Sequence, residues 1–329
     1  MGSNLVFVDD GAPGISRRRL RGKWAYFAPD GARVTDRDEI DRLNRIALPP
    51  AYSNAWFAPD PRGHLQAVGY DAKGRKQYRY HPDFRLEREA RKFELCAAFG
   101  RRLPALRKRV SEDLASRGLT RERAIASVVA LLDTGEIRVG NECYAKVNKS
   151  FGATTLRRRH ATLKGRTLLL RFRGKSGQLR EIACSDSALI RCVRRMQDLR
   201  GQHLFQYLDE DGSPTPINSC DVNDYLHETM GEEFTARNFR TWSASALAFG
   251  LLRENPDIPI GAMMEEVARR LGNTPAIARK SYVHPAVIAA TKAEGRKRAL
   301  PARLPRKTRW MTAAERGLVD FLEGGAGEG

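Results

Sequence analysis

The sequence predicts an α+β protein, with a small β-rich N-terminal domain and a mostly α-helical domain that contains a small three-stranded antiparallel sheet. Three observations support this fold class. Short apolar runs separated by turn signals occupy the first 82 residues, helical periodicity begins at Phe84, and strand-like runs return between residues 162 and 183. A chain of 329 residues is long enough for two domains. We place the domains at 1–82 and 83–295, followed by a basic, partly disordered tail at 296–329.

The N-terminal domain shows two strand–turn–strand patterns. The first surrounds Pro29-Asp30-Gly31, and the second surrounds Lys73-Gly74. The second pattern ends on the sequence QYRY (77–80), in which aromatic and polar side chains alternate. Such a strand suits contact with a nucleic-acid backbone combined with stacking, and a half-exposed strand without a ligand explains it equally well. The His81-Pro82-Asp83 segment breaks the pattern and marks the domain boundary.

The second domain begins with helical periodicity from Phe84. A further helix opens near Thr120, and we expect Gly135 to end it. Short turns at 164–166 and 174–177 separate the three predicted strands, 162–163, 167–172 and 179–183. The remaining predicted helices are 187–199, 219–229, 235–253, 259–271 and 275–294, the last with a break at Pro285. Thr274 and Pro275 are typical of the start of that last helix.

The charge of the chain points to a polyanionic partner. It carries 58 Lys and Arg against 39 Asp and Glu, a net charge of +19. Residues 135–180 hold 12 basic and 2 acidic residues, and no acidic residue lies between Cys143 and Arg180. A phosphate backbone passing over this region explains such a stretch better than a solvated surface, which usually mixes charge signs. We predict DNA contacts in it from Arg157, Arg158, Arg159 and Lys164.

Several classes of protein are disfavoured by the sequence. It has no apolar run long enough to span a membrane and no signal-peptide pattern at the N-terminus. Its five cysteines are scattered and form no C-x-x-C pair, which argues against a zinc site or a disulfide scaffold. Gly174-Lys175-Ser176 resembles the end of a P-loop, but Leu169 stands where the first glycine is required. We therefore expect a cytoplasmic, nucleoid-associated protein with no metal, nucleotide, other cofactor or membrane partner.

What remains is a set of cations and one tyrosine. Arg138 follows a helix end, Lys175 lies at a hairpin tip, and Arg237 and Arg240 are three residues apart, so one helix face can present both. Tyr282 follows a predicted helix start. Each has an ordinary structural explanation by itself, because arginines usually lie on solvated helix faces and tyrosines at the edge of a core.

Together these residues provide what phosphoryl transfer without a metal needs. Guanidinium groups can stabilise the extra negative charge of a five-coordinate phosphorus transition state, since each matches two non-bridging oxygens. A lysine can protonate the leaving alkoxide, and a tyrosine phenolate can act as a covalent nucleophile. A phosphotyrosine keeps the energy of the broken bond, so rejoining the strand requires no ATP.

With these motifs in view, the sequence resembles the type IB DNA topoisomerases, in their small poxvirus-like bacterial form. The resemblance extends from about Gln77 to Pro285. Its most specific segments are IRVGNECY (137–144), SFGATTL (150–156), FRGKSG (172–177), FRTWSAS (239–245), and LGNTP (271–275) with SYVHP (281–285). Their order and spacing carry the resemblance, because any one segment alone would be a weak signal.

The resemblance implies roles for the catalytic candidates. Arg138 and Arg240 correspond to the two arginines that bind the scissile phosphate, and Lys175 to the general acid for the 5′ oxygen. Tyr282 corresponds to the nucleophile that forms a 3′-phosphotyrosyl link. Arg237 stands where poxvirus enzymes have a second lysine that assists proton transfer, and the high pKa of an arginine makes it a poor proton source.

The resemblance also implies binding roles and one departure. Asn273 stands where the viral and eukaryotic members have a histidine, so we expect it to bind a phosphate oxygen without supplying charge. Gln77, Tyr78 and Tyr80 match a DNA-contacting segment, and Tyr144 matches a tyrosine that positions DNA near the cleavage site. The family picture is a monomer that clamps double-stranded DNA between its two domains.

Two alternatives remain open at the level of sequence. A tyrosine recombinase shares the Arg–Lys–Arg–Tyr chemistry, although it usually has H-x-x-R where this chain has Arg237 to Arg240, and a histidine where it has Asn273. A non-enzymatic DNA-binding protein remains if the cations are unrelated in space.

Overall fold

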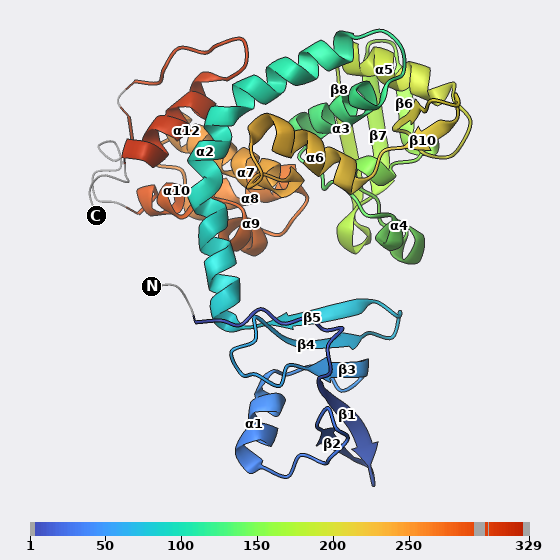
Figure 1. Ribbon diagram of the computed structural model, residues 1–329. Coiled ribbons are helices and arrows are strands. Elements are labelled where there is room, and N and C mark those ends of the chain that lie inside the picture. Colours follow the sequence, from blue (N-terminus) through green and yellow to red (C-terminus); the bar gives the residue numbers. More distant parts are fainter. Residues whose placement is uncertain (1–3, 293–299, 302, 325–329) are drawn as a thin grey trace. The chain divides into compact units, whose positions relative to one another are not determined.

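The computed structural model describes residues 4–292, 300–301 and 303–324 (Figure 1). It contains a five-stranded sheet, a three-stranded sheet, a two-stranded ribbon and a set of helices, so the predicted α+β class is confirmed. The chain divides into two compact units, Met1–Arg91 and Lys92–Gly329, and the division falls within helix α2 (Pro82–Ala115).

The first unit is an antiparallel sheet with one helix packed on it. Its strands are β1 (Ile15–Leu20), β2 (Lys23–Phe27), β3 (Ser53–Phe57), β4 (Leu65–Tyr70) and β5 (Lys76–Tyr80), in the order β2-β1-β3-β4-β5. Helix α1 (Arg37–Arg45) places Leu43 in the same core as Tyr26 and Phe57. This helix was not predicted, because only two of its nine residues, Ile40 and Leu43, are apolar. Asp36 begins it by accepting a hydrogen bond from the amide of Asp38.

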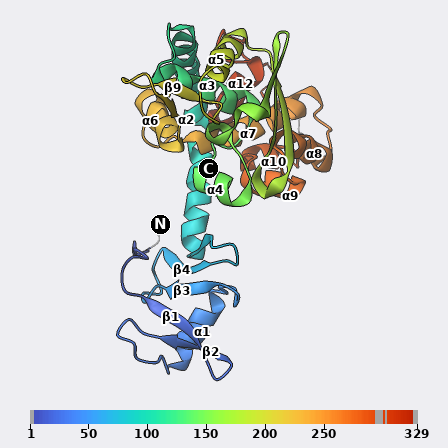
Figure 2. The same ribbon diagram turned by 90° about the vertical axis from the view of Figure 1, so that its right-hand side faces the viewer.

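Helices form most of the second unit. After α2 they are α3 (Arg121–Gly135), α4 (Glu142–Asn148), α5 (Ser187–Gln197), α6 (Ser219–Met230), α7 (Ala236–Glu254), α8 (Ile260–Leu271), α9 (Pro275–Ser281), α10 (Pro285–Ala290) and α12 (Ala313–Gly324). Helix α7 is central, because it packs against α3, α6, α8, α10 and α12 (Figures 1 and 2). Phe239, Trp242 and Phe249 on α7 are fully buried. No helix in the described ranges is long and apolar enough to cross a membrane.

The predicted three-stranded sheet is present. It consists of β6 (Ala161–Lys164), β7 (Thr167–Arg173) and β8 (Leu179–Cys184), in that order and antiparallel. Leu168, Leu170 and Phe172 on β7 face the core while Arg171 and Arg173 face solvent, as strand alternation requires. A short ribbon of β9 (Gln206–Leu208) and β10 (Pro214–Pro216), which was not predicted, follows α5.

The predicted end of α3 at Gly135 is confirmed, and the left-handed conformation falls on the next residue, Glu136, with φ +50°. The structure corrects two other local predictions. The helix predicted at 275–294 is two short helices, α9 and α10, and the chain leaves the first at Tyr282, upstream of Pro285. The predicted tail contains α12, whose Leu318 and Val319 join the core of the second unit. The terminal GGAGEG segment lies outside the described residues.

The loop after α3 is held by a close approach of two backbone segments. The carbonyl oxygen of Arg138 accepts a hydrogen bond of 2.8 Å from the amide of Ala153. Gly152 lies so close that a Cβ atom there would be 2.5 Å from the same oxygen and 2.6 Å from the nitrogen of Gly140. Two of the sequence motifs, IRVGNECY and SFGATTL, therefore pack against each other, and this contact fixes the position of the Arg138 backbone.

Replacing Gly152 with alanine should destabilise this loop, because the added methyl group overlaps backbone atoms that cannot rotate away. We expect a loss of about 1–3 kcal/mol in the free energy of unfolding, measured by thermal or urea denaturation. Gly261→Ala in α8 is the matched control, since a Cβ atom there meets nothing within 4 Å. A Gly152→Ala protein as stable as the wild type would contradict the close approach.

Candidate active site

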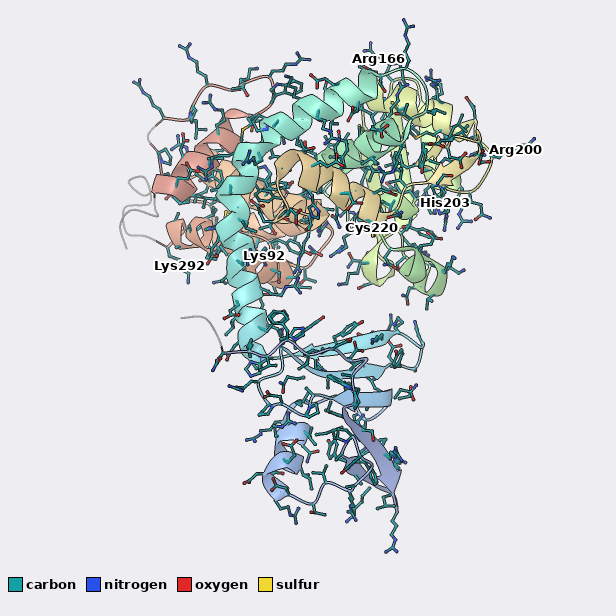
Figure 3. All side chains as sticks on the ribbon, viewed as in Figure 1. Lys92, Arg166, Arg200, His203, Cys220 and Lys292 are labelled. Atoms are coloured by element: carbon teal, nitrogen blue, oxygen red, sulfur yellow. The ribbon has the colours of Figure 1, made fainter. Side chains whose placement is uncertain are left out.

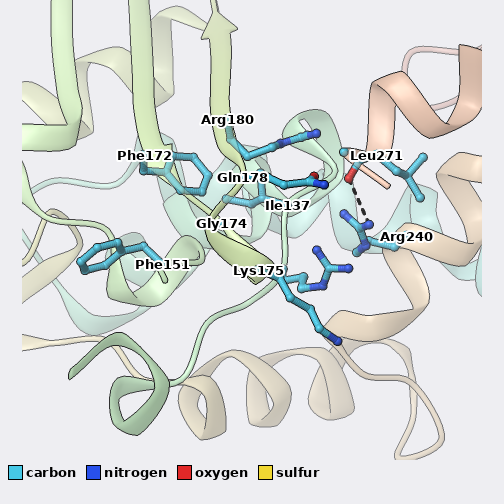
Figure 4. Close-up of a pocket in the computed structure, with 11 residues that line it drawn as sticks. Ile137, Phe151, Phe172, Gly174, Lys175, Gln178, Arg180, Arg240 and Leu271 are labelled. Atoms are coloured by element: carbon cyan, nitrogen blue, oxygen red, sulfur yellow. Dashed lines mark hydrogen bonds between the residues drawn. The ribbon is translucent and has the colours of Figure 1, made fainter. Parts of the chain in front are cut away.

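The C-terminal end of α8 is the anchor of the site. Gly272 ends this helix in the left-handed conformation, and the amide of Asn273 turns back to the carbonyl of Ala268 at 2.9 Å. This turn leaves the carbonyl of Leu271 free to accept a hydrogen bond of 3.1 Å from Nη2 of Arg240 (Figure 4). Backbone carbonyls at a helix C-terminus carry partial negative charge, so they attract cations to this position.

Arg240 is a buried cation on α7, with a side chain only 3% exposed. Its Nη1 donates to the carbonyl oxygen of Glu136, whose left-handed backbone turns that oxygen toward it. Its guanidinium carbon lies 4.8 Å from the centre of the Tyr282 ring. Burial and the nearby charge of Arg138 lower the pKa of Arg240 to about 10. Its Nε has no partner among the described residues, so the guanidinium can still donate.

Arg138 connects the loop after α3 to the end of α8 and to α9. Its Nη2 lies 3.2 Å from Oδ1 of Asn273 and 3.4 Å from the hydroxyl of Tyr282. Asn273 therefore orients the guanidinium through its oxygen, while its Nδ2 is buried and has no partner in the described part of the chain. A buried amide donor without a partner is unusual and suits a site that receives an acceptor atom from a ligand.

Tyr282 is held where the chain leaves α9. The hydroxyl of Ser245, on α7, lies 3.3 Å from the carbonyl oxygen of Tyr282 and accepts a hydrogen bond of 2.9 Å from the amide of His284. Burial alone would raise the pKa of the phenol, but Arg240 and Arg138 stabilise the phenolate, and the pKa of Tyr282 lies below its ordinary value. The site thus favours a nucleophilic form of the side chain.

Lys175 completes a group of cations around one small hollow of about 20 Å³ (Figure 4). It lies exposed at the tip of the β7–β8 hairpin, where a single 3-10 turn (Lys175–Gly177) reverses the chain. The cations that line the hollow are Arg138, Lys175, Arg180 and Arg240. They come from a loop, a hairpin and a helix that are distant in sequence. Such a cluster can bind a phosphate group and stabilise added negative charge on it.

Known protein families match both parts of the chain. A model of the catalytic core of eukaryotic DNA topoisomerase I matches residues 81–304, and one of the N-terminal domain of bacterial DNA topoisomerase IB matches residues 23–71. The DNA topoisomerase 1B of Acanthamoeba polyphaga mimivirus is 34% identical over 285 residues, which cover 82% of this chain and 85% of that protein. The chain belongs to the type IB DNA topoisomerase family.

The chain also has more distant similarities. The DNA topoisomerase 1B of Vaccinia virus (strain Copenhagen) is 22% identical over 288 residues, covering 82% of this chain and 90% of that protein. Among solved structures, the XerH site-specific recombinase bound to difH is similar over 54% of this chain and 48% of that chain, with 15% identity and a TM-score of 0.35. The family predicted from the motifs is confirmed, and DNA is the polyanion to which the charge pointed.

Not every predicted site residue lies in the group of cations around the small hollow. Arg237 is exposed in the first turn of α7, with no hydrogen bond or ion pair to another described residue. In the first unit, Tyr78 and Tyr80 stack on β5 with ring centres 6.0 Å apart, and Tyr78 is 45% exposed. Gln77 on the same strand donates to Asp71 at 3.2 Å.

The predicted DNA contacts of the second unit differ in availability. Arg157 is paired with Glu142 at 2.5 Å, and Arg158 donates to the carbonyl of Leu199 at 2.8 Å. Arg159 and Lys164 are exposed, and neither forms a hydrogen bond or an ion pair with another described residue. The side chain of Tyr144 lies outside the described residues. A larger hollow of about 940 Å³ lies beside Arg157 and Arg159. His203 and Cys220, which are labelled in Figure 3, also line it.

Sequence reasoning missed three residues of the site, Arg180, Glu136 and Ser245. Arg180 was visible only as the last cation of the acid-free stretch, and Ser245 as the end of the FRTWSAS segment. Glu136 is 6% exposed, and its Oε1 lies 3.1 Å from Nε of Arg270. Burial raises the pKa of Glu136, opposed by the charges of Arg270, Arg240 and Arg180. The described residues contain no group of three or more His, Cys, Asp or Glu that could hold a metal ion.

The low pKa of Tyr282 is testable. Removing a neighbouring cation with Arg138→Met should raise this pKa, because the phenolate loses a stabilising charge. We expect ¹³Cζ-tyrosine NMR titration, with the resonance assigned through Tyr282→Phe, to place the wild-type midpoint below about 10 and the Arg138→Met midpoint above it. Arg269→Ala is the control, since Arg269 is exposed and paired with Glu266. An unmoved midpoint in Arg138→Met would remove Arg138 as a cause.

Proposed function

We propose that this enzyme relaxes supercoiled double-stranded DNA, without ATP or a metal ion, by cutting one strand through a 3′-phosphotyrosyl intermediate, letting it rotate and rejoining it. The observation that carries the proposal is the position of Tyr282, whose hydroxyl lies 3.4 Å from Nη2 of Arg138 and whose ring lies under the guanidinium of Arg240. A tyrosine between two arginines can both attack a phosphodiester and have its product charge neutralised.

In the cleavage step, the phenolate oxygen of Tyr282 forms a bond to phosphorus as the bond to the 5′ oxygen breaks. The phenol proton passes to water, and Arg138 and Arg240 neutralise the charge that develops on the non-bridging oxygens. The unpartnered Nδ2 of Asn273 supports a neutral hydrogen bond to one of these oxygens. In religation the 5′ hydroxyl attacks phosphorus, its proton returns to the neutral amine of Lys175, and the Tyr282 phenolate leaves, so the cycle consumes no ATP.

Lys175 is proposed as the general acid. It lines the same hollow as the two arginines, and its place at an exposed hairpin tip lets it approach a leaving oxygen on the DNA side of the site. It transfers a proton to the 5′ oxygen as the P–O bond breaks. Arg237, exposed near the start of α7, is proposed to donate a hydrogen bond to the same side of the phosphate without transferring a proton.

Both domains are proposed to bind DNA. The N-terminal domain, expected at 1–82, presents Gln77, Tyr78 and Tyr80 to the duplex, and the catalytic domain, expected at 83–295, presents Arg159 and Lys164. Exposed aromatic rings and unpaired cations on these strands and turns support the proposal. The basic tail is left without a role, and the enzyme is proposed to act as a monomer.

The relaxation activity can be tested directly. We expect the protein to convert supercoiled plasmid into topoisomers in EDTA without ATP, and Tyr282→Phe to abolish this conversion while DNA binding is retained. Gel electrophoresis of the plasmid measures relaxation, and filter binding measures affinity. Tyr207→Phe is the matched control, because Tyr207 lies on β9 and does not line the catalytic hollow. An absence of relaxation by the wild-type protein at low and moderate salt would reject the proposed function.

The general-acid role predicts a dependence on the leaving group. Lys175→Ala should slow cleavage of an ordinary phosphodiester by about 100-fold or more, yet hardly slow cleavage when sulfur replaces the 5′ oxygen, because a thiolate leaves without a proton. Single-turnover formation of the covalent complex is the measurement. Lys108→Ala, an exposed lysine on α2, serves as the control. Equal slowing on both substrates would assign Lys175 to binding instead of proton transfer.

A further inference from the structure

We propose that Arg180 is a third guanidinium that contacts the scissile phosphate, beside Arg138 and Arg240. This inference rests on the proposed function, since it adds a residue to the same reaction. Arg180 lines the catalytic hollow together with those two arginines and Lys175.

The strand register explains why this side chain points into the site. Arg180 is paired with Phe172 across the β7–β8 hairpin, and directly opposed residues of antiparallel strands lie on the same face. Phe172 is buried, so this is the inner face of the sheet, while the neighbouring pair of Arg171 and Glu181 faces solvent and forms an ion pair of 3.0 Å. An arginine on the inward row of a strand must have a partner or a ligand to compensate its desolvation.

The side chain of Arg180 has room because two glycines, Gly174 and Gly272, lie against it. It passes Gly174, where a Cβ atom would lie 3.3 Å from Cγ of Arg180. Its Nη1 reaches Gly272, where a Cβ atom would lie only 2.0 Å away. Figure 4 shows Arg180 extending from the hairpin toward Leu271 at the end of α8. Any side chain at position 272 would displace it.

The hydrogen bonds of Arg180 leave its charge available. Nη2 donates to the carbonyl of Arg270 at 3.0 Å, one residue before the carbonyl that holds Arg240. No carboxylate forms an ion pair with Arg180 within the described chain, because the nearby Glu136 pairs with Arg270 instead. Burial, together with the charges of Arg138 and Arg270, lowers the pKa of Arg180 despite the opposing effect of Glu136. A half-buried cation held by a neutral carbonyl is suited to an anionic ligand.

This position also compensates for a neutral residue in the site. Asn273, which follows Gly272 and binds Arg138, contributes an amide to the site and no charge. Arg180 approaches the same end of α8 from the opposite element, the hairpin, and brings a permanent positive charge to it. The geometry assigns to Arg180 a hydrogen bond to a non-bridging oxygen of the scissile phosphate, made as that oxygen gains charge in the transition state.

The test combines the Arg180→Ala variant with DNA substrates in which a methyl group replaces one non-bridging oxygen of the scissile phosphate. A cleavage site is first mapped on a labelled duplex with wild-type enzyme, and two substrates are made that carry either diastereomeric methylphosphonate at that position. We expect Arg180→Ala to slow covalent-complex formation by about 100-fold on the ordinary phosphodiester. On the diastereomer whose methyl group replaces the contacted oxygen, the slowing should fall to a few-fold, because the interaction is already absent.

Control variants distinguish a phosphate contact of Arg180 from a purely structural role of this side chain. Arg180→Lys should recover part of the lost rate, and millimolar guanidinium should partly restore Arg180→Ala. Arg269 is an exposed residue on the last turn of α8, and Arg269→Ala should match the wild type on every substrate. Equal slowing of Arg180→Ala on all three substrates, with no rescue, would overturn the proposal and leave a purely structural role. A wild-type enzyme that forms no covalent complex would instead reject the proposed function itself.

Discussion

The structure depends on one constraint: two guanidinium groups, Arg138 and Arg240, must be held at Tyr282 with a third, Arg180, beside them, although like charges repel one another. Carboxylates in their midst would cancel the charge that a phosphate needs. The chain uses neutral acceptors instead, and the last carbonyls of α8 hold Arg240 and Arg180 while Asn273 holds Arg138. The partial negative charge of a helix C-terminus offsets repulsion without forming an ion pair. The cations therefore stay available to an incoming anion.

This constraint accounts for features that are otherwise unexplained. Glu136 adopts a left-handed conformation that a bulky residue seldom takes, and its carbonyl is thereby turned to Arg240. Its carboxylate is directed to Arg270, away from the reacting group. Gly272 ends α8 without a side chain, so that a guanidinium can lie against it. Ser245 fixes the backbone on either side of Val283, which sets the position of Tyr282.

Much of the fold could be predicted from periodicity, because the long helices and the β7–β8 hairpin carry clear apolar patterns. Short elements could not, since α1, α4 and the β9–β10 ribbon contain too few apolar residues to show a clear pattern. Gly135 ends α3 as its type predicts, but the left-handed residue is Glu136, whose carbonyl binds Arg240. The helix predicted across Tyr282 breaks earlier because Ser245 binds the backbone between α9 and α10.

By itself, the sequence determined the family, the class of fold and the identity of the principal candidates, Arg138, Lys175, Arg240 and Tyr282. These follow from residue types at fixed spacings, which can be read directly from the sequence. Only the tertiary structure decided which cations share a hollow. Arg237 stands apart and Arg180 joins, although in sequence both are simply basic residues near a motif. The reason is that burial and hydrogen bonding at the end of α8 are set by strand register and helix termination, which bring together residues far apart along the chain.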